Sequence, residues 1–510
     1  MCVRTDPARL AQSAHQAGRA RARWPGLIWS GLCALLASCA VGPNFERPTP
    51  PVVEHYAFGG DPTATVNAHG SAQNFMLGRA VAADWWQLFS SPQLNELVAE
   101  SLNGNPTLDA ARANLRQSQD SLRSGYGIFY PQVALDASAT RQRFAPIKFG
   151  ESLPSSIFNL FTLSASVSYV LDLFGAERRA VEALGAQVDA QRASAQAAYL
   201  VLTSNVVNAV IAKAAYQAQI DATRGLIALQ REQVSLAEVQ VRAGTAPYST
   251  VLSLQSQLSS YEATIPQLEQ RLTQSDDLLA TLSGHLPAES RPRDITLAQL
   301  TLPGSLPVSL PSQLVRQRPD ILLAEASLHT ASAEVGVATA ALFPSITLSG
   351  AYSANSTTTA GLLSPQGRAW GVAGDVSAPL FEGGNLWFKR KAAIDGYEQA
   401  RSLYRQTVLT AFAQVADTLR ALEHDAAALR AQDEALRTAE QALHLVQINY
   451  AAGLATYLDV LNADTQYHQA QINDVQALAL RYQDTVALFA ALGGGWWNAR
   501  GAPLTSSGAP

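Results

Sequence analysis

The chain contains an internal duplication, and this repeat limits the possible folds more than any other feature. Two prolines that bound a helix-forming stretch return at an offset of 213 residues, and later segments return at an offset of 209. The matching positions are Pro106 and Pro131 with Pro319 and Pro344, residues 243–248 with 452–457, and Gly284 with Gly493. A match that keeps its register over so many residues indicates a tandem repeat of one structural unit.

Each copy has the same predicted order of elements: helix, strand, loop, strand, very long helix, turn and helix. We assign the first copy to residues 91–284 and the second to 313–493, joined by a proline-rich linker at 285–312. An extended segment at 39–90 precedes them. The small, polar tail at 494–510 is expected to be disordered.

The N-terminus has the pattern of a lipoprotein signal peptide. Arginines in residues 19–23 precede an apolar stretch at 24–37, which is too short to span a bilayer as a helix. It ends in Leu36-Ala37-Ser38-Cys39, which resembles a bacterial lipobox. We therefore expect residues 1–38 to be removed and Cys39 to carry a covalent lipid, and no later segment reaches the length of a membrane-spanning helix.

The clearest local pattern lies in residues 161–172, where every odd position is apolar and nearly every even one is Thr, Ser or Asp. Residues 132–141 would pair with this strand, and 345–353 and 370–381 repeat the pattern more weakly. Alternation over about ten residues is typical of a membrane β-strand. A half-buried soluble sheet would explain any one strand, but four strands of similar length and a lipid anchor favour the membrane.

Four strands cannot close a membrane barrel, because known barrels start at about eight. The chain must therefore oligomerise to satisfy its strand edges. Two copies would give eight strands, whose side chains would largely fill the interior. Three copies would give twelve strands and leave a channel.

The predicted helices at 176–243 and 385–452 contain no proline. At a rise of 1.5 Å per residue, each would be about 100 Å long. Helices of this length need continuous packing partners, and a composition rich in Ala, Gln and Ser suits close packing around a wet interior. A soluble coiled coil would account for the helices but not for the strands.

Charge and motifs disfavour nucleic-acid binding and catalysis. Residues 1–38 hold five Arg and one Asp, so their removal takes the net charge from −5 to about −9, whereas a nucleic-acid partner needs a basic patch. The sequence contains no HExxH, GxSxG, P-loop or CxxC motif, and scattered exposed histidines suggest neither a metal site nor an active site. We therefore expect no enzymatic activity.

The chain resembles the TolC-like outer membrane factors, in particular their NodT-type lipoprotein branch. The residues that carry this resemblance run from the lipobox to the last helix in the order typical of the family. They are residues 39–45, 85–89, 105–108, 171–175, 318–321, 379–384 and 458–461.

The resemblance implies a mainly α protein with membrane β structure: a trimer with a 12-stranded outer-membrane β-barrel, four strands per chain, continued by a long periplasmic α-helical barrel. Such a trimer is the exit duct of a tripartite efflux system that exports small molecules. Its implied partners are a periplasmic adaptor and an inner-membrane pump, often of the resistance-nodulation-division type. A type I secretion conduit for polypeptides and a general diffusion porin are the alternatives, and a porin has no use for long helices.

The resemblance also points to residues at the far end of the helices. Asp459 falls on an acidic position of the family's periplasmic gate, and Asn462 stands where many members have a second aspartate. The alternative for Asp459 is a favourable first-turn residue of a helix. The helix-hairpin tips, expected to reverse the chain and to dock the adaptor, contain Gly244, Thr245, Gly453 and Leu454.

Overall fold

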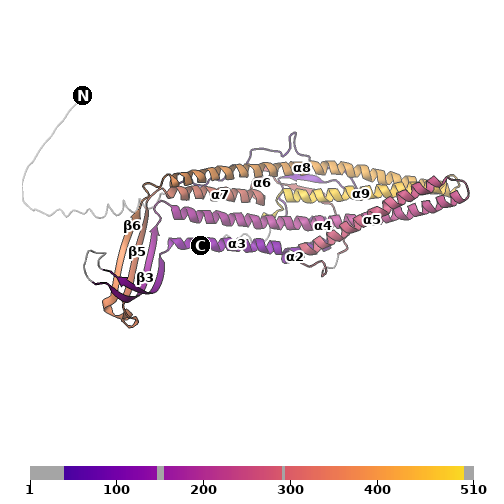
Figure 1. The fold of residues 1–510 in the computed structure, drawn as a ribbon. Helices are drawn as coiled ribbons and strands as arrows, with labels where there is room; N and C mark the ends of the chain where they lie inside the picture. The colour runs from indigo at the N-terminus through magenta and orange to yellow at the C-terminus, as the bar shows by residue number, and fades with distance from the viewer. Residues whose placement is uncertain (1–39, 146–153, 290–292, 499–510) are drawn as a thin grey trace, which may run out of the picture.

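The computed structural model describes residues 40–145, 154–289 and 293–498. The predicted signal peptide and Cys39 lie outside these ranges. The protein is elongated, with a small β-sheet at one end and two helical hairpins that extend away from it to the opposite end (Figure 1).

The duplication predicted from the sequence is visible in matching elements. The first copy contains α3 (Pro106–Gly125), β2 (Gln132–Phe144), β3 (Ser156–Leu171), α4 (Ala176–Arg242) and α5 (Tyr248–Leu282). The second contains α7 (Pro319–Ala340), β5 (Ser345–Ser356), β6 (Arg368–Ser377), α8 (Asn385–Ala451) and α9 (Tyr457–Ala491). The long helices α4 and α8 both have 67 residues, and α5 and α9 both have 35.

The four long strands form one antiparallel sheet in the order β2-β3-β5-β6. The strand expected at 370–381 begins earlier, at Arg368, and ends at Ser377, because Pro379 follows and cannot donate to a strand ladder. The strand expected at 132–141 continues to Phe144, where it still pairs with Ser156.

The register gives this sheet one apolar face and one polar face. Residues directly opposite each other on paired strands point to the same side, so each row of partners crosses the sheet on one face. One apolar row consists of Val133, Val167, Gly350 and Val372, and a polar row consists of Asp136, Ser164, Ser353 and Ala369. Val133 and Val372 are 77% and 80% exposed, so the apolar face is uncovered in the protomer.

The N-terminal segment and the linker are structured where they meet the middle of the helices. Segment 39–90 contains β1 (Asn74–Leu77), and the linker predicted at 285–312 contains β4 (Ser305–Val308); these two strands pair in parallel. The linker joins the two copies as expected, but the strand within it was not predicted. The short helices α2 (Pro92–Gly104) and α6 (Pro311–Gln317) flank this region.

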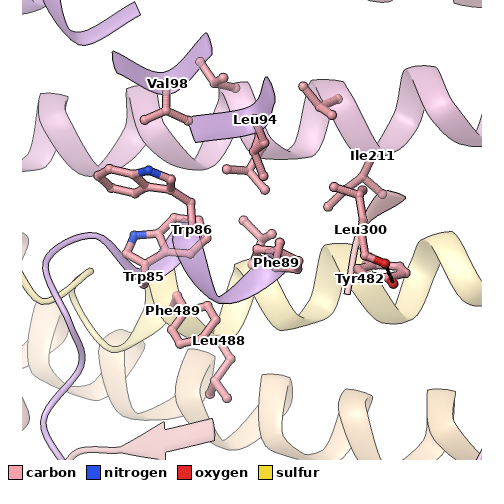
Figure 2. Packing of buried hydrophobic residues seen from close by; sticks show 14 of the residues in the cluster. Trp85, Trp86, Phe89, Leu94, Val98, Ile211, Leu300, Tyr482, Leu488 and Phe489 are labelled. Atoms are coloured by element: carbon pink, nitrogen blue, oxygen red, sulfur yellow. Dashed lines mark hydrogen bonds between the residues drawn. The ribbon is translucent and has the colours of Figure 1, made fainter. Parts of the chain in front are cut away.

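The main hydrophobic core also lies at the middle of the helices and is built around aromatic residues (Figure 2). Trp85 is fully buried and stacks on Phe489 of α9, with ring centroids 5.1 Å apart. Tyr482 donates a hydrogen bond from its hydroxyl to the carbonyl of Leu300 at 2.8 Å. The motif Trp85-Trp86 thus holds the N-terminal segment against the second hairpin.

Two other expectations need correction. The tail predicted to be disordered from 494 is ordered through Asn498, and the indole of Trp496 donates to the carbonyl of Gln317 at 2.8 Å. Residues 499–510 lie outside the described ranges. Contrary to the expectation that no later segment could span a membrane, α4 contains a stretch long and apolar enough to do so, but 56% of that stretch is buried inside the protein. It is the central helix of the body, in contact with α5, α7 and α9.

Candidate functional site

The two helical hairpins end in turns that we call the helical tips, residues 243–247 and 452–456. Each turn reverses the chain through a glycine with positive φ, 77° at Gly244 and 73° at Gly453, a conformation that glycine adopts without steric cost. The following residue donates its backbone N–H to a carbonyl of the last helical turn, as in a Schellman cap. The bonds are Thr245 to Gln240 at 2.9 Å and Leu454 to Asn449 at 2.8 Å.

All four residues predicted at the tips are exposed. Leu454 is the most notable, because its apolar side chain is 80% exposed at the end of the molecule.

Asp459 takes part in a capping box at the start of α9. Its carboxylate accepts hydrogen bonds from the backbone N–H of Thr456 at 2.8 Å and from the Thr456 hydroxyl at 2.7 Å. These bonds hold the pKa of Asp459 below its ordinary value, so the group stays charged. Asn462 is exposed one turn further along. Asp459 therefore has a local structural role, and its carboxylate is fully exposed.

A contact between the two hairpins lies beside this helix start and was missed by the sequence analysis. The hydroxyl of Tyr457, the first residue of α9, donates a hydrogen bond to the carboxylate of Glu232 on α4. This bond raises the pKa of Tyr457 to about 12. Tyr450 packs against the same ring, with centroids 5.6 Å apart.

The contact occurs in only one copy of the repeat. At the offset of 209, Tyr457 corresponds to Tyr248 and Glu232 corresponds to Gln441. Because Gln441 carries no charge, the first copy offers Tyr248 no equivalent carboxylate. This difference between the two copies is the sequence signal that could have drawn attention to the pair.

A second carboxylate lies close to Glu232. Burial, and to a lesser extent the negative charge of Glu232, raise the pKa of Asp464 on α9, while His468 opposes the shift at a distance of 3.7 Å. The first two turns of α9 thus present Asp459, Asn462 and Asp464, and Glu232 of α4 adds to this acidic character.

The expectation that the histidines are exposed holds for His285 but not for His329 and His468, which are half-buried. Three of them also pair with carboxylates: His285 with Glu100 at 3.0 Å, His329 with Glu182 at 2.9 Å, and His468 with Asp464. His424 and His444 are exposed on α8.

At the other end of the molecule, the first described residues lie where the sheet joins the helices. Val41 donates its backbone N–H to the carbonyl of Phe174 at 3.0 Å, between β3 and α4. A Cβ atom added at Gly175 would lie 2.7 Å from Ala40. The residue that follows Cys39 is therefore fixed beside the base of the sheet.

Comparison with known proteins agrees with this architecture. Residues 97–285 and 310–494 match the family model described as outer membrane efflux protein. Nodulation protein T of Rhizobium leguminosarum bv. viciae is 29% identical over 471 residues, covering 91% of this chain and 92% of that protein. The pyoverdine export outer membrane protein OpmQ of Pseudomonas aeruginosa is 32% identical over 438 residues, covering 83% and 90%.

A solved structure has the same fold. The outer-membrane channel OprN superposes with a TM-score of 0.77 at 28% identity, covering 90% of this chain and all of that one. The family match spans both copies of the repeat and both helical tips. The chain belongs to the outer membrane efflux protein family.

Proposed function

We propose that this chain is the outer-membrane exit duct of a tripartite efflux system, through which small molecules leave the cell. The observation that carries the proposal is the four-stranded sheet at one end of the long helices, in which β2 and β6 are the edge strands. Unpaired edges are not tolerated in lipid. Three copies, with β6 of each paired to β2 of the next, would close a 12-stranded barrel.

The two faces of the sheet support this assignment. The row containing Val133, Val167 and Val372 would face lipid, and the row containing Asp136 and Ser164 would line a wet lumen. The long helices would continue the wall of the duct through the periplasm.

The proposed partners follow from the match to efflux proteins of the outer membrane. The duct would supply passage and gating, and an inner-membrane pump, of the resistance-nodulation-division type or similar, would supply the energy. The exposed tips around Gly244, Thr245, Gly453 and Leu454 would dock a periplasmic adaptor. The pyoverdine-export relative supports a small-molecule cargo.

Two further roles rest on the same assembly. A lipid on Cys39 would insert beside the barrel, since Ala40 and Val41 lie at the base of the sheet. Asp459 and Asn462 would form part of the periplasmic gate, and the bond between Tyr457 and Glu232 would hold the second hairpin against the first in the closed state.

The duplication predicts the register between protomers and thereby a test. Strands β2 and β5 correspond at an offset of 213, and β3 and β6 at 209. These offsets are consistent with the observed pairing within each copy. Ala137 lies opposite Leu163 in the first copy, and the equivalent residues Gly350 and Val372 lie opposite each other in the second.

The same offsets predict the contact between subunits. Val167 of β3 pairs with Gly350 of β5, and the equivalent residues are Val376 of β6 and Ala137 of β2. Val376 should therefore lie opposite Ala137 of the partner subunit.

The experiment is a disulfide cross-link in the membrane. The double variant Val376→Cys with Ala137→Cys should give a covalent trimer on oxidation, because directly opposed Cβ atoms lie about 4.5–5.5 Å apart. The control, Val376→Cys with Asp136→Cys, puts the second thiol on the opposite face and should remain monomeric in a denaturing gel. Covalent dimers only, or equal cross-linking in the control, would contradict the proposed barrel.

A further inference from the structure

A short hairpin in the N-terminal segment brings a histidine to the pair α8–α9. Ala68 and Ser71 exchange backbone hydrogen bonds of 3.1 Å, and the turn between them has positive φ at both residues, 51° at His69 and 72° at Gly70. Positive φ at both central positions is the conformation of a type I′ turn. A positive φ costs free energy at a residue other than glycine. Contacts with the surrounding residues must therefore hold His69 in this conformation.

The hairpin is held in place independently of that histidine. Arg481 of α9 is fully buried and donates to the side chains of Gln73 and Thr65, both at 3.1 Å. Gln73 in turn donates to Thr485 at 3.1 Å. The imidazole of His69 is therefore presented to α9 from a fixed backbone.

Three side chains of types that can bind a metal ion, each from a different segment, meet beside His69. His69 Nε2 lies 2.8 and 3.0 Å from the two carboxylate oxygens of Asp474 on α9. Asp433 of α8 points to the same place, and one ligand atom from each residue lies within 4.8 Å of the other two. Asp474 is only 4% exposed, and a carboxylate this deeply buried requires a positive partner.

The histidine pairs with Asp474, and Asp433 pairs with Arg437, but neither pair by itself explains why all three potential ligands converge on one point. Donor atoms bound to one ion at about 2.0–2.2 Å lie about 3–4 Å apart, so these groups need to move by little more than an ångström. We propose that His69, Asp433 and Asp474 bind a divalent first-row transition metal ion, Zn²⁺, Ni²⁺ or Cu²⁺, which joins the N-terminal hairpin to α8 and α9.

The donor set and the charge fit this class of ion. One imidazole with two carboxylates suits these metals, whereas Mg²⁺ and Ca²⁺ prefer oxygen ligands alone. The two carboxylates neutralise the charge of the ion. Arg437, which lies 3.2 Å from Asp433, would have to move, but its side chain is 56% exposed and such a surface pair contributes little free energy. Water would complete the coordination at the exposed side of His69.

The test uses the full-length lipoprotein, purified in detergent on a tag without histidine and stripped with EDTA. Equilibrium dialysis against Zn²⁺ should give one tightly bound ion per protomer. His69→Asn should weaken binding by at least about tenfold, and this change preserves the fold because asparagine tolerates positive φ. Asp474→Asn should have the same effect.

The control is His55→Ala, which removes another imidazole of the N-terminal segment, one that lies 3.8 Å from the single carboxylate of Asp61. This variant should bind Zn²⁺ as the wild type does. With Cu²⁺, electron paramagnetic resonance should show coupling to an imidazole nitrogen that is lost in His69→Asn. Absence of a stoichiometric ion in the wild type, or equal binding by wild type and His69→Asn, would overturn the proposal.

Discussion

Asp459 has an observed role in a helix and a proposed role in a pore. Its carboxylate caps α9 through Thr456, and in a trimer three such carboxylates near the axis would attract cations. Substitution by alanine would therefore mix two effects. The two roles can be separated, because asparagine keeps a hydrogen-bond acceptor while removing the charge.

We predict that Asp459→Asn lowers cation selectivity in planar bilayers with little change in thermal stability. Asp459→Ala should lower selectivity equally and also destabilise the start of α9. Because the capping bonds lower the pKa of this group, the effect of its charge should persist from neutral pH into more acidic solution than for an ordinary aspartate. Reversal potentials measured across a salt gradient test this, and unchanged selectivity in both variants would place the constriction elsewhere.

The bond between Tyr457 and Glu232 joins the two hairpins near their tips. We predict that Tyr457→Phe, which removes only the hydroxyl, raises the basal conductance of the trimer severalfold, because the second hairpin loses a contact that restrains it. Tyr248→Phe is the matched control, since this tyrosine occupies the equivalent position in the first copy. A rise of the same size in the control would exclude a specific role for the pair.

At the scale of elements, the sheet makes the sharpest predictions because its register fixes which residues face lipid. Val167→Arg puts a charge on the apolar face and should cost about 2–4 kcal/mol near the bilayer midplane. Ser166→Arg, one residue away on the polar face, should cost much less. The yield of membrane-inserted trimer measures both, and equal losses would mean that the faces are assigned wrongly.

The contact between α8 and α9 contains a pair of carboxyl groups that should make it sensitive to pH. Burial and a hydrogen bond with Asp425 raise the pKa of Asp484 to about 7. A raised pKa gives stability that is complete below the unfolded value of about 3.9 and is lost as the pH rises toward 7. The α8–α9 contact should therefore weaken over this range.

Asp484→Asn should remove this dependence and stabilise the protein at pH 7.5 by about 1 kcal/mol, a figure reduced for the solvent that reaches the pair. Thermal unfolding of wild type and variant at pH 5 and 7.5 measures the effect. Asp417→Asn, an exposed position on α8, should leave the pH dependence intact. A wild type whose stability does not fall between these pH values would contradict the prediction.

The elements also show how far sequence reasoning reaches. The strands, long helices and turns could be predicted because they depend on patterns within short stretches of sequence, such as the alternation in residues 161–172. The constant offset between the copies then supported each assignment a second time. The bond from Tyr457 to Glu232 and the contact of His69 with Asp474 join residues 225 and 405 positions apart. A pattern within a short stretch of sequence cannot reveal contacts between residues so far apart. The strand within the linker was not predicted, because β4 is a strand only through its pairing with β1.

For the whole molecule, the N-terminal segment connects the membrane end to the middle of the helical body. It begins at the base of the sheet, where Val41 bonds to Phe174, and reaches the core where Trp85 stacks on Phe489. A lipid at Cys39 would thus enter the bilayer beside the barrel that we propose for the trimer. The barrel has its own apolar face, so anchoring and insertion should be separable.

We therefore predict that Cys39→Ser abolishes metabolic labelling with a fatty acid, while trimer yield and single-channel conductance fall less than about twofold. Insertion should persist because burial of the twelve strands in lipid far exceeds what acyl chains contribute to membrane binding. Cys33→Ser, which changes a cysteine inside the expected signal peptide, should keep full labelling. Labelling that survives in Cys39→Ser would disprove the lipid anchor at this residue, and loss of all inserted trimer would show that the anchor is needed before the barrel can close.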